Sequence, residues 1–314
     1  MNKYIRIASV AAAVAALACA CSREIVPEAE PEFVDMPFVF SAEDAQGDLT
    51  RAAASLFPEV ENWIFDIYYC QYAADGPSLM SGHIRKNVAV TDGTLTATEQ
   101  ITLRTASNST VVFAANFVPM GANYGDNPNW GETTITFGGV NNLGDLKNVK
   151  FDMSKRLAKA QDGTLKHMPM TGYWVGDVTG AAGGTGSKPA TVTMGRLVSK
   201  ICVNITNNTA AAITSVKINN AAKNAYLFPQ AENNLLVAAD YTTFTDNVNI
   251  AAGATGTLYF YTAPNYCQKN GNVTSFTFTN AAGKKATQIV GSDMEVGDFN
   301  LYMNTIYTFH FTLK

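Results

Sequence analysis

Two cysteines near the start of the chain have surroundings that indicate a definite chemistry. Cys19 and Cys21 lie at the end of an uncharged apolar run that begins at residue 7, and two basic residues precede that run. This order is typical of a secretory signal peptide, and the run is shorter than the about 20 apolar residues that span a bilayer. We therefore expect residues 1–20 to be a signal peptide that is removed on export.

The chemistry expected at this junction is acylation of a thiolate. Residues 17–22 read Leu-Ala-Cys-Ala-Cys-Ser, and small residues directly before a cysteine resemble the lipobox of bacterial lipoproteins. Such proteins are cut before the cysteine and diacylated on its sulfur, because the thiolate is the nucleophile. Cys21 is favoured because Ala20 precedes it and a polar stretch follows, with Cys19 as the alternative. An ordinary signal peptide with incidental cysteines is the competing interpretation.

The segment after this junction reads as a solvated tether. Residues 22–35 contain four Glu and two Pro and show no apolar period. Such a composition favours an extended, hydrated chain over a packed one. We therefore expect residues 21–35 to be a lipid anchor and tether that lifts a folded body off the membrane.

Residues that could support catalysis or metal binding stand apart from one another. The remaining histidines and cysteines occur singly, at His83, His167, His310, Cys70, Cys202 and Cys267. Their spacings match neither metal ligands nor a disulfide framework. In the glycine-rich stretch, Ser187 separates Gly186 from Lys188, so the phosphate-binding succession Gly-Lys-Ser/Thr is missing. We expect no metal, no cofactor and no enzymatic activity.

The charge of the chain argues against a nucleic-acid partner. The formal net charge is −4, and only 15% of the residues are charged. A protein that binds a phosphate backbone needs a basic patch or stripe, and none is present.

One polar loop could bind a ligand. Asp126, Asn129 and Trp130 combine oxygen ligands with an aromatic ring that could stack on a sugar or lie beside a calcium ion. The same residues are also typical of a plain turn, because Asn, Asp and Pro each favour turns. Both interpretations stay open on the sequence.

Short runs of Val, Ile, Thr, Phe and Tyr between turn residues predict an all-β protein. We expect strands at residues 37–41, 63–72, 95–104, 110–117, 190–205, 215–218, 256–261, 275–279 and 304–313. Residues 143–158 lack strand alternation and could be helical or looped. In the last strand Tyr307, Phe309 and Phe311 alternate with Thr308 and His310, which predicts one buried and one wet face.

The length of the chain predicts two cores. Hydrophobic residues make up 47% of the chain, and about 290 residues remain after the signal, while domains commonly have about 100–150. Antiparallel strands with one apolar face pack as sandwiches. We place the division near Ala190, to within about ten residues, which gives domains 36–189 and 190–314. Alternatively, the glycine-rich loop 176–189 is a long hairpin turn inside one domain.

Three stretches resemble the fimbrillin family, the type V pilins and accessory lipoproteins of Gram-negative anaerobes. They are residues 37–69, which include Leu49-Thr50-Arg51-Ala52, residues 194–203 and residues 304–313. The resemblance implies two tandem antiparallel β-sandwiches of the fimbrillin-like, transthyretin-like kind. It also implies an outer-membrane or cell-surface location and a fimbria built by β-strand exchange between subunits.

In that family a trypsin-like protease cuts after an arginine and the first strand leaves with the lipid. Carried onto this chain, the cut would fall between Arg51 and Ala52. The removable strand would comprise Pro37, Phe38, Val39, Phe40 and Ser41. A strand from a neighbouring subunit would then occupy the groove by β-strand addition.

Stalk subunits of the family commonly continue past the closing strand into a donor appendage, whereas this sequence stops at Lys314. An anchor or tip role is therefore expected at least as much as a stalk role. The alternative function is a monomeric surface lipoprotein that binds glycans or host ligands through the loop of Trp130.

Overall fold

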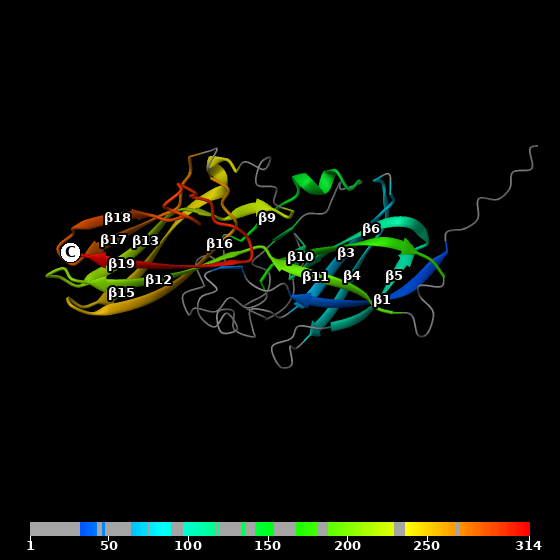
Figure 1. The fold of residues 1–314 in the computed structure, drawn as a ribbon, viewed down its shortest axis with the longest axis horizontal. Coiled ribbons are helices and arrows are strands. Elements are labelled where there is room, and N and C mark those ends of the chain that lie inside the picture. Colours follow the sequence, from blue (N-terminus) through cyan, green and yellow to red (C-terminus); the bar gives the residue numbers. More distant parts are fainter. Residues whose placement is uncertain are drawn as a thin grey trace, which may run out of the picture. The chain divides into compact units, whose positions relative to one another are not determined.

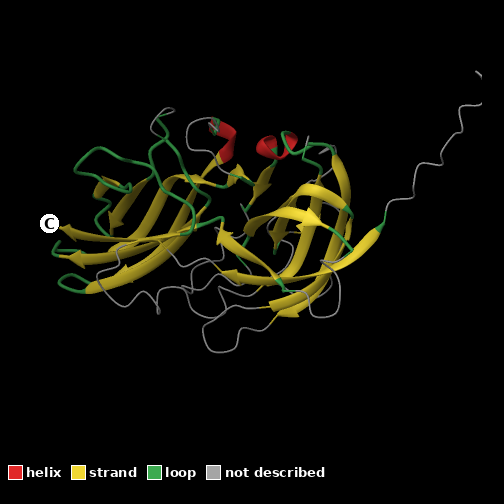
Figure 2. Cartoon of the chain, turned by 45° about the vertical axis from the view of Figure 1, so that its right-hand side comes forward, coloured by secondary structure: helices red, strands yellow, loops and turns green. Residues whose placement is uncertain are grey.

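The computed structural model describes most of the chain after the tether. The described residues are 32–42, 46–47, 64–74, 76–88, 97–116, 118–119, 134–135, 142–153, 168–180, 188–228, 236–267 and 271–314. The elements below belong to a compact unit of residues 33–314. This part of the chain is all-β apart from two short 3-10 helices, η3 (Asp145–Asn148) and η5 (Ala238–Asp240) (Figure 2). None of its helices has the length and apolar character needed to cross a bilayer.

A seven-stranded sheet has the order β4-β3-β6-β10-β11-β1-β5. Its strands are β1 (Phe33–Ala42), β3 (Ile64–Tyr72), β4 (Ser78–Val88), β5 (Ala97–Arg104), β6 (Ala106–Ala115), β10 (Met170–Val178) and β11 (Ala190–Arg196). Neighbouring strands are antiparallel except β1 and β11, which run parallel. In this parallel pair, the first strand of the sheet along the chain, β1, lies beside the last one, β11.

Two four-stranded sheets follow, with the orders β16-β12-β19-β2 and β15-β13-β17-β18. Their strands are β2 (Gln46–Gly47), β12 (Ser199–Asn207), β13 (Ile213–Ala222), β15 (Tyr241–Ile250), β16 (Thr255–Thr262), β17 (Ser275–Asn280), β18 (Lys285–Ile289) and β19 (Thr305–Leu313) (Figure 1). The rings of Phe260 and Phe276 are 5.1 Å apart, as are those of Phe278 and Phe311. The two sheets therefore bury their apolar faces against each other.

A small fourth sheet has the order β14-β9-β8-β7. Its strands are β7 (Val118–Pro119), β8 (Thr134–Ile135), β9 (Lys150–Asp152) and β14 (Asn224–Tyr226). Pairing of β9 with β14 joins segments far apart in the sequence.

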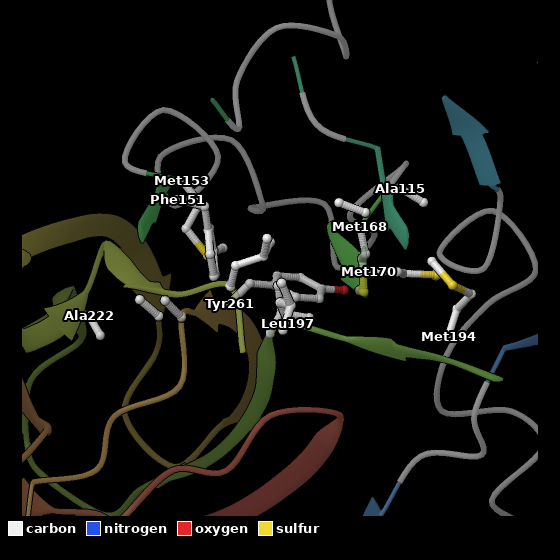
Figure 3. Close-up of a cluster of buried hydrophobic side chains, with 14 of the residues drawn as sticks. Ala115, Phe151, Met153, Met168, Met170, Met194, Leu197, Ala222 and Tyr261 are labelled. Atoms are coloured by element: carbon white, nitrogen blue, oxygen red, sulfur yellow. The ribbon is translucent and has the colours of Figure 1, made fainter. Parts of the chain in front are cut away.

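The buried hydrophobic side chains form one continuous cluster. The cluster includes Met168, Met170, Met194, Leu197 and Tyr261, and the ring of Tyr261 points toward Met170 (Figure 3). Methionine adapts to irregular spaces. This part of the core therefore fills the space between strands of different sheets.

The structure divides one predicted strand. Residues 190–205, expected as a single strand, form β11 and β12, with a break at Leu197 and Val198. β11 belongs to the seven-stranded sheet and β12 to a four-stranded one, so the chain changes sheets at that break. The two-domain division near Ala190 stays a prediction. Residues 143–158 contain η3 and β9, and the rest of that stretch, from 154, lies outside the described residues.

Candidate functional site

The strand β1 turns every second side chain from Val34 to Phe40 into the core, and Pro37 between them is also buried. Val34, Met36, Phe38 and Phe40 are buried, and the two phenylalanines are 0% exposed. Pro37 has no N–H to give to a ladder and is tolerated where a strand has one neighbour. β1 pairs with β5 over residues 33–40 but with β11 only from Phe38 onward, so Pro37 is the last residue before the second neighbour begins.

The aromatic side chains of β1 sit in a cradle of rings. The centroid of Phe38 lies 5.3 Å from that of Phe113, with the rings tilted, and 5.6 Å from that of Trp174, with the rings edge to face. Phe40 lies 5.0 Å from Phe113, also edge to face. Such pairs add about 0.5–1.5 kcal/mol to the energy of area burial. β1 thus packs its rings against β6 and β10, in addition to its backbone ladders with β5 and β11.

β5 depends on β1 because β1 is its only strand partner in the described part of the chain. Ile101 and Leu103 of β5 are nonetheless buried. Removal of β1 would separate β5 from β11 and expose these side chains. β1 therefore holds the sheet together and does not merely cover its edge.

Two side chains of β3 supply the remaining support for β5. Gln71, which is fully buried, donates from Nε2 to the Arg104 carbonyl at 2.7 Å and accepts from the Arg104 N–H at 2.8 Å. The Tyr69 hydroxyl donates to the Thr102 carbonyl at 3.2 Å. These bonds replace part of a backbone ladder. If β1 were absent, these side-chain bonds would be the hydrogen bonds that still attach β5 to β3.

A glycine explains the position of Tyr69. A Cβ at Gly82, the cross-strand partner of Tyr69, would lie 2.3 Å from its ring. Only glycine lets the ring lie across β4 and reach β5. Burial, with a smaller contribution from the charge of Asp35, raises the pKa of the Tyr69 hydroxyl. It therefore stays protonated and can donate at neutral pH.

Between described side chains, one hydrogen bond joins the polar side of β1 to β5. The Thr102 hydroxyl donates to Asp35 Oδ1 at 2.5 Å. Asp35 is exposed, so water competes for this bond. Specific polar contacts contribute little to retaining β1 compared with its apolar face.

The short strand β2 pairs in parallel with Thr305 and Ile306 of β19. Beyond Ile306 this edge of β19 has no strand partner among the described residues. A recess of about 760 Å³ runs beside Thr305–Phe309, and residues 291–295 form its other wall. An unpaired strand edge beside a recess can accept an additional strand.

Several predicted site residues lie outside the described ranges. They are Cys19, Cys21, Arg51, Ala52, Asp126, Asn129 and Trp130. In contrast, all five residues of the predicted removable strand, Pro37–Ser41, lie within β1. Tyr69 and Gln71 had no signal in the sequence, because both are common residues of ordinary strands. Across the described ranges, no three His, Cys, Asp or Glu side chains gather to hold a metal ion.

Comparison with solved structures identifies the fold. The tip fimbrial protein Mfa3 from Porphyromonas gingivalis, with a C-terminal truncation, is similar at TM-score 0.55 and 15% identity, over 90% of this chain and 96% of that chain. The fimbrial anchor protein Mfa2 from the same organism is similar at TM-score 0.51 and 11% identity, over 89% of each chain.

A candidate cell adhesion protein from Parabacteroides distasonis is similar at TM-score 0.55 and 12% identity, over 89% of this chain and 88% of that chain. No protein-family model and no curated protein matches the sequence. The chain therefore has a fimbrillin-like fold, as the sequence resemblance predicted. Sequence identities of 11–15% show a shared fold and do not show a shared function.

Proposed function

We propose that the protein is a structural or accessory subunit of a cell-surface fimbria, exported as a lipoprotein and assembled by β-strand exchange. The observation that carries this proposal is the position of β1 between β11 and β5. A strand near the start of the chain, rich in buried aromatic side chains, holds the sheet together. Its loss would create a groove that another strand can occupy.

Cleavage after Arg51 would remove β1 and β2 together, because both precede that residue. The groove left by β1 would lose four buried side chains, Val34, Met36, Phe38 and Phe40. Burial of such a side chain is worth about 1.5–3 kcal/mol. An apolar groove with unpaired backbone groups on both sides favours capture of a strand of similar pattern.

In this proposal the protein consists of two tandem β-sandwiches on a lipidated tether. The chain changes sheets at residues 197–198, and this change supports a division within about ten residues of the predicted position near Ala190. Lipidation at Cys21, or at Cys19, would hold the precursor at the outer membrane. An anchor subunit would keep this lipid and escape cleavage, whereas a tip or stalk subunit would lose it.

A second candidate is a monomeric surface lipoprotein that binds glycans or host ligands. The similarity to a candidate cell adhesion protein over most of both chains favours it. The two functions differ in their products after processing. Strand exchange predicts oligomers that resist heat in detergent, and a monomeric binder predicts none.

Limited proteolysis tests the assembly proposal. The full chain with Cys19 and Cys21 replaced by serine is treated with limiting trypsin, and products are followed by intact mass and by gel without boiling. We expect a stable fragment beginning at Ala52 that oligomerises, and no such fragment from the matched control Arg51→Gln. A synthetic peptide of residues 33–42 added in excess should suppress the oligomers. A fragment cut at Arg51 that stays monomeric would contradict strand exchange.

A further inference from the structure

A recess opens at the end of the paired four-stranded sheets where β12, β17 and β19 meet their turns. The β12–β13 loop (residues 208–212), the β17–β18 turn (residues 281–284) and the last residues of β19 enclose about 460 Å³. This volume falls within the range of small-molecule sites, about 300–1,000 Å³. The recess lies apart from β1 and from the unpaired edge of β19 beside Thr305.

The wall of this recess is fixed by a buried amide. Asn207 is 0% exposed, and its Nδ2 donates to the carbonyls of Ala211, Ile250 and Ala251 at 2.9–3.1 Å. Its Oδ1 accepts from the N–H and hydroxyl of Thr209. These bonds tie the β12–β13 loop to the β15–β16 turn. The loop is therefore positioned before any ligand arrives.

The opposite wall holds a polar side chain with an unused donor. Asn280 is only 7% exposed, and its Oδ1 accepts from the N–H groups of Ala282 and Lys284 at 3.1 and 2.9 Å. The two bonds fix the orientation of the amide, and no side-chain or backbone acceptor in the described chain takes a bond from Nδ2. Gly283, with φ +76°, allows the tight turn that brings Lys284 back over Asn280.

The ionisable side chains that line the recess are all cationic. Lys284 and Lys285 are exposed on its rim. None of the lining residues is Asp or Glu. In a chain whose net charge is −4, this concentration of cations favours a negatively charged ligand locally.

The remaining lining is polar at the surface and apolar only beneath it. Phe278, Ile213 and Leu313 form the floor and are almost fully buried. The exposed lining includes Asn208 and Gln288, which can donate to and accept from hydroxyl groups. Such a surface matches a polyhydroxylated ligand better than an apolar side chain.

We infer that this recess binds an anionic saccharide, with its carboxylate or sulfate group at Lys284 and Lys285 and its hydroxyl groups at the amides of Asn280, Asn208 and Gln288. The inference deepens the adhesive part of the proposed function by naming a ligand class. Nucleic acid fits less well, because a phosphate backbone is tracked by a longer basic stripe. An acidic peptide is an outcome that the test must distinguish.

Binding is measured on the uncut full chain with Cys19 and Cys21 replaced by serine, so that failure of strand exchange cannot affect the result. Isothermal titration uses four probes: a sulfated heparin tetrasaccharide, a tetragalacturonate, neutral maltotetraose and a tetra-aspartate peptide. We expect saturable binding of at least one acidic saccharide at 0.15 M salt. Maltotetraose and the peptide should bind at least about tenfold more weakly, which corresponds to about 1.4 kcal/mol.

Variants locate the site. Lys284→Gln with Lys285→Gln should weaken binding of the acidic saccharide by about tenfold or more, because both charge-assisted hydrogen bonds to its anionic group are lost. Asn280→Asp keeps the Oδ1 acceptor but replaces the donor by an anion, and it should weaken binding similarly. The matched control Lys188→Gln removes an exposed lysine next to β11 and should leave binding unchanged. Thermal unfolding of each variant checks that it is folded.

Three results would overturn the inference. They are absence of binding by both acidic saccharides, equal weakening by Lys188→Gln, and peptide binding as tight as saccharide binding. The first would show that the recess is not a saccharide site at all. The second would show general charge attraction, and the third would show a peptide site.

Discussion

Lys150 Nζ lies 2.6 Å from Asp240 Oδ2 and joins β9 to η5 across 90 positions of the sequence. The carboxylate also accepts from the Val237 N–H at 2.9 Å and from Asn224 Nδ2 at 3.1 Å. Burial alone would raise the pKa of Asp240, but the bonds from Lys150, Val237 and Asn224 outweigh it and hold this pKa below its ordinary value of 3.8. The pair therefore fastens the small sheet to the 3-10 helix that precedes β15.

This pair predicts a stability difference that depends on pH. Lys150→Met should reduce the free energy of unfolding by about 1–3 kcal/mol at pH 7, because a buried carboxylate loses its charged partner. A carboxyl whose folded pKa is depressed contributes stability above its unfolded pKa and loses it as the pH falls through the folded value. The difference between wild type and variant should therefore shrink below pH 3.8. Urea unfolding at pH 7, 5 and 3 measures it, with the exposed Lys217→Met as control. A difference that is the same at all three values would contradict the role of Asp240.

The register of β19 predicts unequal costs at neighbouring positions. Phe311 contacts the rings of Phe276 and Phe278 at 6.2 and 5.1 Å, while His310 is exposed. Phe311→Ala should cost about 2–4 kcal/mol, somewhat less than the about 3–5 kcal/mol of a fully buried phenylalanine, because the ring is only half-buried. His310→Ala should stay within about 0.5 kcal/mol of wild type. Equal losses in denaturant unfolding would mean that the inward face is wrongly assigned.

The bond between Gln71 and Arg104 predicts how β5 is held. Gln71→Leu should cost about 1–3 kcal/mol, because the half-buried N–H and carbonyl of Arg104 lose their side-chain partners. Hydrogen exchange should speed up in residues 97–104 more than in β10 or β11. The matched control is Gln100→Leu at an exposed position of β5. Unchanged exchange in β5 would show that β1 alone supports that strand.

Lipidation is the prediction on which the cellular location depends. Cells that express the chain and are fed a clickable palmitate analogue should label the wild type, and Cys21→Ser should lose most of the label if Cys21 is the acceptor. Loss only in the Cys19→Ser variant would move the site to the alternative. An unlabelled wild type would exclude the lipoprotein hypothesis, whatever the fold.

The alternating strands were predictable because their apolar residues recur with a period of two. Phe38 and Phe40 are buried in β1, and Tyr307 begins the predicted inward face of β19, which confirms both assignments. β10 was missed because its outward residues include Tyr173 and Val175, which are 66% and 51% exposed, so no polar alternation marks the strand. β15 and β18 were missed because Thr, Asn and Lys dominate them.

The support of β5 could not be predicted from the sequence. Glutamine is usually exposed, so nothing distinguishes Gln71 from a surface residue until β3 and β5 are brought together. The two residues of β2 are likewise too few to show a period. Arg51 and Trp130 remain sequence predictions, because they lie outside the described residues.

The thiol of Cys267 gives the last prediction. It is fully buried, and its Sγ donates to the Phe299 carbonyl at 2.9 Å. Burial raises the pKa of this thiol to about 11, and the charge of Asp298 adds to the shift. Because only the thiolate reacts, iodoacetamide at pH 8 should alkylate Cys267 in the native protein far more slowly than the half-buried Cys70.

Peptide mass spectrometry of the variant lacking Cys19 and Cys21 follows each site separately. In 6 M guanidinium chloride, where burial and the Phe299 bond are lost, Cys267 should react as fast as Cys70. The denatured sample is therefore the control for peptide recovery and intrinsic reactivity. Equal native rates at Cys70 and Cys267 would show that the loop carrying Phe299 opens on the timescale of labelling, and the buried assignment of Cys267 would then be wrong.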